Sequence, residues 1–243
     1  MNCPKCGHTN HSDAIDCARC GVVFAKLRRR AASEGGDGSE VVAPESPTPQ
    51  RGALGQLLFS VPEQVDSFYL WGRAIVLAVI AVWGFKLIFS SIASNAAGES
   101  VLHLINLPFH ETGHIVFRPF GRFMTSLGGT LLQLIIPLVC LVALLLKTRD
   151  TFGAAVCLWW FGENFLDIAP YINDARAGVL PLVGGNFGNS SPYGFHDWEF
   201  ILTETGLMRY DHLFAKMSHL FGSALMVLAL LWGGYVLWLQ YRR

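Results

Sequence analysis

Long apolar runs begin after residue 66 of the chain, whereas the first 66 residues are polar and rich in charge. A transmembrane helix needs about 20 mostly apolar residues to cross the hydrocarbon core of a bilayer. Four runs approach or exceed this length: Tyr69 to Ala93, Phe123 to Leu146, Phe152 to Ile172 and Leu220 to Leu239. The pattern therefore predicts a mainly α protein, specifically a polytopic helical membrane protein.

A fifth apolar segment, Val101 to Phe117, is about 17 residues long and lies at the short limit for a span. It either crosses the membrane or enters and returns, which gives four or five membrane segments. Basic residues at 147 and 149 and at the C-terminus favour four crossings, with both termini in the cytoplasm. We expect an integral protein of the bacterial inner membrane. Because the chain opens on a cysteine cluster, we expect no secretory signal peptide.

Composition supports the membrane prediction and argues against a nucleic-acid partner. Hydrophobic residues make up 52% of the chain and charged residues 15%, whereas soluble domains carry about 25% charged residues. The net charge is zero. The basic run Lys26 to Arg30 is the only feature that would attract nucleic acid, and five residues are a weak basis for such binding. We therefore expect nucleic acid to be an unlikely partner and the lipid bilayer to be one.

Four of the six cysteines lie within the first twenty residues, as two C-x2-C pairs: Cys3, Cys6, Cys17 and Cys20. Two such pairs can bring four thiolates to one tetrahedral zinc ion, and a glycine after each pair allows a tight turn. A disulfide pair or a redox dithiol are the alternatives. The pattern favours a structural zinc ribbon over residues 1–24, which resembles the ribbons at the N-termini of many bacterial membrane proteins and would contact a protein partner.

The next region is dense in Gly, Ser, Glu and Pro, a composition that cannot bury a core. It predicts a flexible linker over residues 25–66, followed by a membrane domain over residues 67–243.

The short segment contains the sequence His110-Glu111-Thr112-Gly113-His114. On a helix, residues i and i+4 share a face, so both imidazoles can bind one metal ion. Zinc with an open position lowers the pKa of bound water to about 7, and the neighbouring Glu111 can take its proton as general base. Ionisable residues inside a membrane segment are costly and indicate function. His103, two turns earlier on the same face, is expected to support or gate this site.

A third metal ligand is required, and the sequence leaves several candidates. Asn164, Asp167, Tyr171 and Asp174 form one polar stripe if their segment is helical. Burial favours Asp167, and the alternative for Asp174 is an ion pair with Arg176 at a helix end. His196 and Asp197 follow a glycine-rich stretch. The whole segment from Arg176 to Tyr210 is expected to cap the site as a lid.

These motifs resemble the site-2 protease family of intramembrane zinc metalloproteases. The resemblance covers roughly residues 101–176: the H-E-x-G-H sequence, the helix start at 127–133, and the segment from Asn164 through Pro170 to Asp174. It implies that His110, His114 and Asp174 bind zinc, that Glu111 is the general base and that Asn164 contacts the substrate backbone. Relative to the family, Ala175 replaces a glycine and the second motif is about two residues longer.

Two functions follow from these features. The first is a membrane-embedded zinc metalloendopeptidase that hydrolyses a peptide bond in a membrane-anchored protein. It would carry one structural zinc in the ribbon and one catalytic zinc in the membrane domain. The alternative is a non-enzymatic membrane zinc protein, which acts as a sensor or as a pseudoprotease scaffold.

Overall fold

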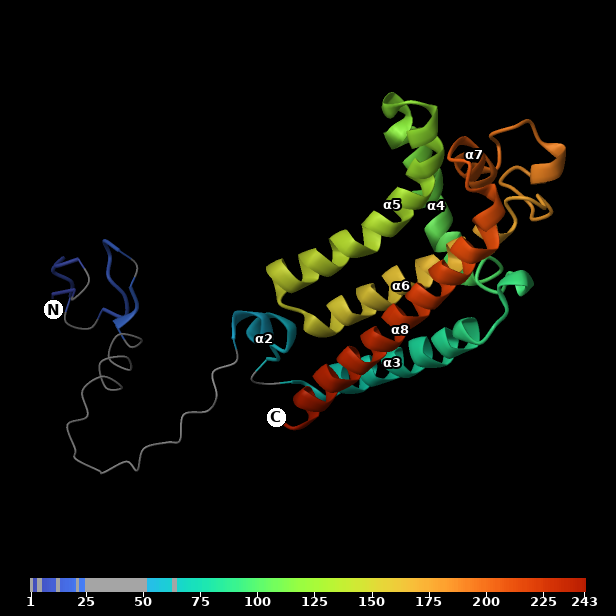
Figure 1. Cartoon of the computed structure of the whole chain (residues 1–243). Coiled ribbons are helices and arrows are strands. Elements are labelled where there is room, and N and C mark those ends of the chain that lie inside the picture. The colour runs from blue at the N-terminus through green and yellow to red at the C-terminus, as the bar shows by residue number, and fades with distance from the viewer. Residues whose placement is uncertain (1, 4–5, 12–13, 21, 25–51, 63–64) are drawn as a thin grey trace. The chain divides into compact units, whose positions relative to one another are not determined.

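The computed structural model describes residues 2–3, 6–11, 14–20, 22–24, 52–62 and 65–243 (Figure 1). The chain forms two compact units, Met1–Gln50 and Arg51–Arg243. The basic run Lys26 to Arg30 and most of the predicted linker lie outside the described residues.

The described part of the first unit is built around its cysteines. Two isolated antiparallel β-bridges, Asn2 with Thr9 and Asp16 with Val23, bring the chain together beside each C-x2-C pair. Cys3 and Cys17 are buried and pack with Phe24. A single aromatic ring and the cysteines are therefore almost all the core that the described residues of this unit possess.

The second unit is helical. Its helices are α2 (Ala53–Leu58), α3 (Ser67–Ile88), α4 (Val101–Phe117), α5 (Arg122–Ala143), α6 (Thr151–Asn173), α7 (Asp197–Glu204) and α8 (Asp211–Tyr241). Across the described residues there are isolated β-bridges but no β-strand. The prediction of a mainly α fold with a cysteine cluster at its N-terminus is confirmed.

Within the part of the chain that the structure describes, three helical stretches are long and apolar enough to cross a membrane: Ser67–Ile88, Arg122–Thr148 and Met208–Tyr241. Only 6% of the α3 window is buried inside the protein, so its apolar side chains face outward, as lipid-facing residues do. The remaining predicted span, Phe152 to Ile172, corresponds to α6, which falls outside this set. The count of four to five segments therefore stays a prediction.

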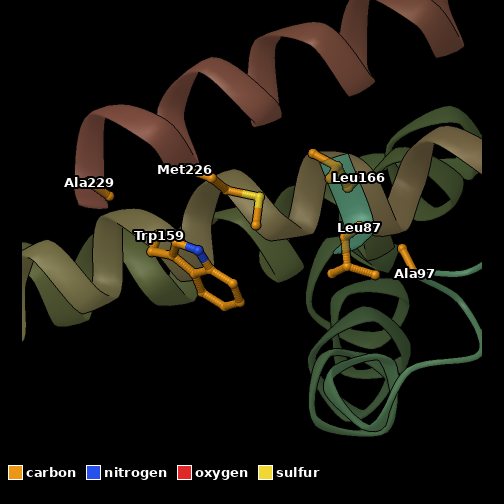
Figure 2. Packing of buried hydrophobic residues seen from close by; sticks show 6 residues of the cluster. All are labelled: Leu87, Ala97, Trp159, Leu166, Met226 and Ala229. Atoms are coloured by element: carbon orange, nitrogen blue, oxygen red, sulfur yellow. The ribbon is translucent and has the colours of Figure 1, made fainter. Parts of the chain in front are cut away.

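α6 is the central helix, with α5 and α8 packed against it (Figure 1). A Cβ on Gly162 would lie 2.8 Å from the carbonyl oxygen of Gly222 on α8, so glycine allows the two backbones to approach closely, as in membrane helix pairs. Figure 2 shows Met226 of α8 directed toward α6 between Trp159 and Leu166. This packing leaves α6 with little surface for lipid.

Part of the predicted linker packs on the helical unit. The indole Nε1 of Trp232 donates to the Leu58 carbonyl at 2.8 Å, and Thr151 Oγ1 donates to the Ser60 carbonyl at 2.8 Å. Val61 is buried beside α6 and α8. The predicted linker over residues 25–66 thus extends too far, because its last part offers backbone acceptors and an apolar side chain that the helices use.

Candidate metal centre

In the first unit, the four cysteine sulfurs lie within 4.8 Å of one another. Sγ of Cys3 is 3.7 Å from Sγ of Cys20, and Sγ of Cys6 is 3.7 Å from Sγ of Cys17. Disulfide sulfurs are about 2.05 Å apart, whereas thiolates bound to zinc at about 2.3 Å lie about 3.8 Å from each other. The spacing therefore fits a tetrahedral metal ion.

The cysteine thiols differ in acidity: although a backbone hydrogen bond from Val22 acts to lower the pKa of Cys20, burial and the other three thiols raise it to about 12, whereas that of Cys17 is lowered. Burial acts to raise the pKa of the Cys17 thiol, but hydrogen bonds from the backbone N–H groups of Arg19 and Cys20 outweigh burial and lower that pKa to about 6. The thiolate is the form that binds metals. All four ligand positions are filled by sulfur, so such a site would be closed and structural.

In the second unit, α4 brings His110 and His114 together with a ring-centroid separation of 4.8 Å. Gly129 of α5 lies against both rings, because a Cβ built there would be 2.7 Å from His110 Nε2 and 2.7 Å from His114 Cε1. A Cβ on Gly113 would overlap the backbone of Gly128. Glycines on both helices thus let α4 and α5 approach closely enough to enclose the imidazoles.

Asp197, the first residue of α7, completes this group. Its Oδ2 lies 3.2 Å from His110 Nε2 and 3.4 Å from His114 Nε2. Ligand atoms around a tetrahedral zinc ion at about 2.0–2.1 Å are about 3.3 Å apart. The carboxylate oxygen of Asp197 therefore lies at the distance from each imidazole nitrogen that two ligands of one metal ion require.

The second nitrogen of each ring is already occupied by an acceptor. His110 Nδ1 lies 3.1 Å from Gln133 Oε1, and His114 Nδ1 lies 2.8 Å from the carbonyl oxygen of Thr125. Both contacts require a proton on Nδ1, so a neutral ring presents a lone pair on Nε2. Two nitrogen lone pairs and a carboxylate oxygen then face one another, an arrangement that a cation between them would stabilise. Metal-binding histidines typically make this kind of outer contact.

A buried polar network extends from Gln133 into the bundle. Its Nε2 donates to Asp167 Oδ2 at 3.0 Å, while Asp167 Oδ1 lies 2.8 Å from His103 Nδ1. Asn106 Nδ2 donates to both Asp167 Oδ2 and Glu163 Oε2 at 3.0 Å. Asp167 is thus committed to three side chains and supports His110 through Gln133. His103 contacts Asp167, and its expected role in supporting or gating the site stays a prediction.

Asp174 does not join the imidazoles in this structure. Its carboxylate accepts hydrogen bonds from the backbone N–H groups of Val179 (3.0 Å) and Leu180 (2.9 Å). Its Oδ2 also lies 3.5 Å from His196 Nε2. These contacts follow from its position at the end of α6, where it organises the next turn. The carboxylate that lies against both imidazoles is that of Asp197, which the sequence left as an alternative.

Asn164 is likewise not placed for substrate contact. It is fully buried in α6, and its Nδ2 donates to the carbonyl oxygen of Trp160 at 2.8 Å. It does not line the cavity described next. The helical geometry turns Asn164 toward the packed interior, whereas Asp167 and Tyr171 on the same helix reach the cavity.

A cavity of about 780 Å³ opens onto the centre. Its lining includes His110, Glu111, His114 and Asp197, together with Tyr171 and the segment Leu180 to Val183. Glu111 is exposed, and one of its carboxylate oxygens lies within 4.8 Å of ligand nitrogens of both histidines. A polar reactant in this cavity can therefore reach the imidazoles, the carboxylate of Glu111 and any metal ion held between them.

Sequence reasoning did not identify Gln133 or Thr125 as partners of the imidazoles. Gln133 is the one amide side chain in the apolar run from Phe123 to Leu146, and a buried amide in such a run requires a polar partner. That signal would have indicated Gln133. No sequence signal indicates Thr125, which contributes only its backbone carbonyl.

No protein-family model, curated protein or solved structure matches this chain. The structure alone therefore indicates the class of protein. In the described residues it is a mainly helical protein with three helices apolar enough to cross a membrane and two groups of side chains that could each hold a metal ion.

Proposed function

We propose that the protein is a membrane-embedded zinc metalloendopeptidase of the site-2 protease type, acting on a membrane-anchored protein. One observation carries the proposal: Oδ2 of Asp197 lies 3.2 Å from Nε2 of His110 and 3.4 Å from Nε2 of His114, with the Glu111 carboxylate within 4.8 Å of ligand atoms of both histidines. These residues fit zinc, which favours nitrogen and oxygen ligands and leaves a fourth position open in catalytic sites.

Each residue has a distinct part in hydrolysis. His110, His114 and Asp197 would hold the zinc ion, which supplies a Lewis acid and acidifies a water molecule when bound. Glu111 lines the same cavity and would take the proton of the attacking water and return it to the leaving amine. Gln133 and the Thr125 carbonyl keep each imidazole proton on Nδ1, so that both Nε2 atoms stay available.

The helix lengths support four crossings. α6 has 23 residues and would span about 34 Å, more than the hydrocarbon core of about 30 Å. α4 has 17 residues and would span only about 25 Å. We propose that α3, α5, α6 and α8 cross the bacterial inner membrane and that α4 enters and returns. The N-terminal ribbon is then cytoplasmic, where it can contact a protein partner.

The test compares the wild-type protein with Glu111→Gln in proteoliposomes. Fluorescently labelled casein and a panel of single-span membrane proteins serve as substrates, and zinc per chain is measured by mass spectrometry. We expect Glu111→Gln to keep two zinc ions per chain and to lower cleavage by a factor of about 10²–10⁴, the usual contribution of a general base. Glu99→Gln, a carboxyl on the same cavity wall, is the matched control and should cleave normally.

Two outcomes would count against the proposal. Retained cleavage by Glu111→Gln would remove Glu111 from the mechanism. A wild-type protein that holds zinc at His110 and His114 yet cleaves none of these substrates would favour the non-enzymatic alternative, a zinc-dependent sensor or scaffold.

A further inference from the structure

The residue that completes the metal centre lies at the end of a long connection. Residues 174–196 join α6 to α7, and Asp197 follows immediately. The same connection supplies part of the cavity wall, from Leu180 to Val183, together with Gly194 and Phe195. The placement of one metal ligand and the shape of the cavity therefore depend on the same stretch of chain.

Tyr171 of α6 holds the end of this connection against the helical bundle, at Asp197. Its hydroxyl accepts a hydrogen bond from the backbone N–H of Asp197 at 3.0 Å and donates to Asp197 Oδ2 at 3.3 Å. The ring of Tyr171 packs against His196, with centroids 4.2 Å apart, and approaches His110 at 6.3 Å. One side chain thus holds both the backbone and the ligand oxygen of Asp197.

Asp174 and His196, the first and last residues of the connection, lie side by side, with Asp174 Oδ2 3.5 Å from His196 Nε2. His196 is fully buried, and its Nδ1 accepts the backbone N–H of Glu199 at 3.2 Å, which caps α7. Gly178 has a φ of +59°, and a Cβ there would collide with the backbone of Asn189. The connection is therefore folded back on itself and closed over the centre.

We propose that Tyr171 is a positioning residue that couples metal binding to closure of the segment 178–196. This inference rests on the proposed metal centre, and it assigns that centre a form of regulation. When the segment is closed, three ligands face the metal position; when it opens, only the two imidazoles remain. Zinc then favours the closed segment, and the closed segment favours zinc by the same factor, because linkage between binding equilibria is reciprocal.

A functional consequence follows for the reaction. Loss of zinc would open the cavity wall as well as remove the Lewis acid, so an empty centre would also bind substrate poorly. Zinc availability would therefore control access to the cavity as well as chemistry within it.

The experiment uses full-length protein in detergent with Cys3→Ser and Cys17→Ser, so that zinc titration reports only the centre in the second unit. Zinc affinity is measured by competition with a chelating dye. Hydrogen exchange of residues 178–196 is followed by mass spectrometry with and without zinc. Tyr171→Phe removes the hydroxyl but keeps the ring. Tyr193→Phe is the control, because its hydroxyl in the same segment bonds Glu204 instead.

We expect Tyr171→Phe to weaken zinc affinity about 10–100-fold, as loss of an outer-shell partner does. In the zinc-free protein, it should also accelerate exchange of residues 178–196 by a similar factor. Exchange within α6 and α8 should be unchanged, which separates positioning from general destabilisation. Tyr193→Phe should match the parent protein in all three readouts.

The outcomes distinguish this inference from the proposed function. If the parent protein binds zinc, His110→Ala with His114→Ala abolishes it, and Tyr171→Phe binds zinc as tightly as the parent, the coupling is wrong while the metal centre stands. Unchanged hydrogen exchange of residues 178–196 in Tyr171→Phe would also overturn the coupling. If the parent protein binds no zinc through His110 and His114, the metal centre fails and the coupling fails with it.

Discussion

The cysteine centre of the first unit and the histidine–aspartate centre of the second gather their ligands in opposite ways. All four sulfurs come from the first twenty residues, and the chain around them has little other core. The second centre joins α4 to α7, more than 80 residues later, within a packed bundle. The first centre is closed and would build its own fold, whereas the second is open to a cavity and is built by a fold that exists around it.

The largest expected effect is on the first unit, because its fold depends on a bound metal ion and the fold of the helical unit does not. Cys17→Ser should unfold the first unit, because structural zinc contributes roughly 10–16 kcal/mol to zinc-finger folding. Zinc per chain should fall from two to one, and residues 1–24 should become sensitive to protease. The thermal unfolding of the helical unit should not change. Loss of both zinc ions in this variant would show that the two centres are not independent.

The second expected effect identifies the third ligand of the open centre. Asp197→Asn should weaken zinc affinity by more than the 10–100-fold that loss of an outer-shell partner costs, since it removes a charged ligand. Asp174→Asn should have a smaller effect, because that carboxylate contacts backbone N–H groups and His196. Zinc titration of both variants decides between them, and the reverse order would restore Asp174 as the ligand.

A third substitution tests whether the bundle shapes the open centre. Gly129→Ala adds a methyl group against both imidazoles, so we expect a loss of about 1–3 kcal/mol in the free energy of unfolding and weaker zinc binding. Gly234→Ala on α8 is the control, because the nearest atom to its added methyl group would be 3.8 Å away. Thermal unfolding and zinc titration give the comparison. If the two variants had the same thermal stability and the same zinc affinity, α5 would not hold the imidazole rings in place.

The smallest expected effect concerns the outer contacts that only the second centre possesses. Gln133→Leu leaves His110 Nδ1 without its acceptor and Asp167 Oδ2 without one donor. Zinc affinity should fall about 10-fold, the low end for an outer-shell partner. Gln240→Leu, at a buried position near the end of α8, should leave affinity unchanged. An unchanged zinc affinity in Gln133→Leu would show that the Gln133 acceptor is not needed to keep the His110 proton on Nδ1.

The same contrast explains what could be predicted from the sequence. Spacing along the chain is enough to predict the two cysteine pairs and the histidines at i and i+4, since each set is local. The helix predicted over Phe152 to Ile172 agrees closely with α6. Asp197 is different, because it reaches the imidazoles only through the fold of the connection after α6, and single-chain periodicity carries no signal for that.

Asp174 and Asn164 show the limit of transferring a motif. Both occupy polar positions on a helix whose packing partners were unknown from sequence. The structure turns Asn164 into the interior and uses Asp174 to accept backbone N–H groups. The last part of the predicted linker packs on the helices for a related reason. Backbone carbonyls such as that of Ser60 find donors only in the folded bundle.

The long sequence separation of Asp197 from His114 gives a bound metal ion a second physical effect. An ion held by both residues would close a loop of roughly 80 residues, as a disulfide does. In the chain-entropy treatment, a cross-link of that length stabilises a protein by about 4.5 kcal/mol. This figure is an upper bound for helices already confined by a bilayer, because their unfolded ensemble is narrower. The ion would thus act as a reversible cross-link, tying the end of α4 to the start of α7 only while zinc is supplied.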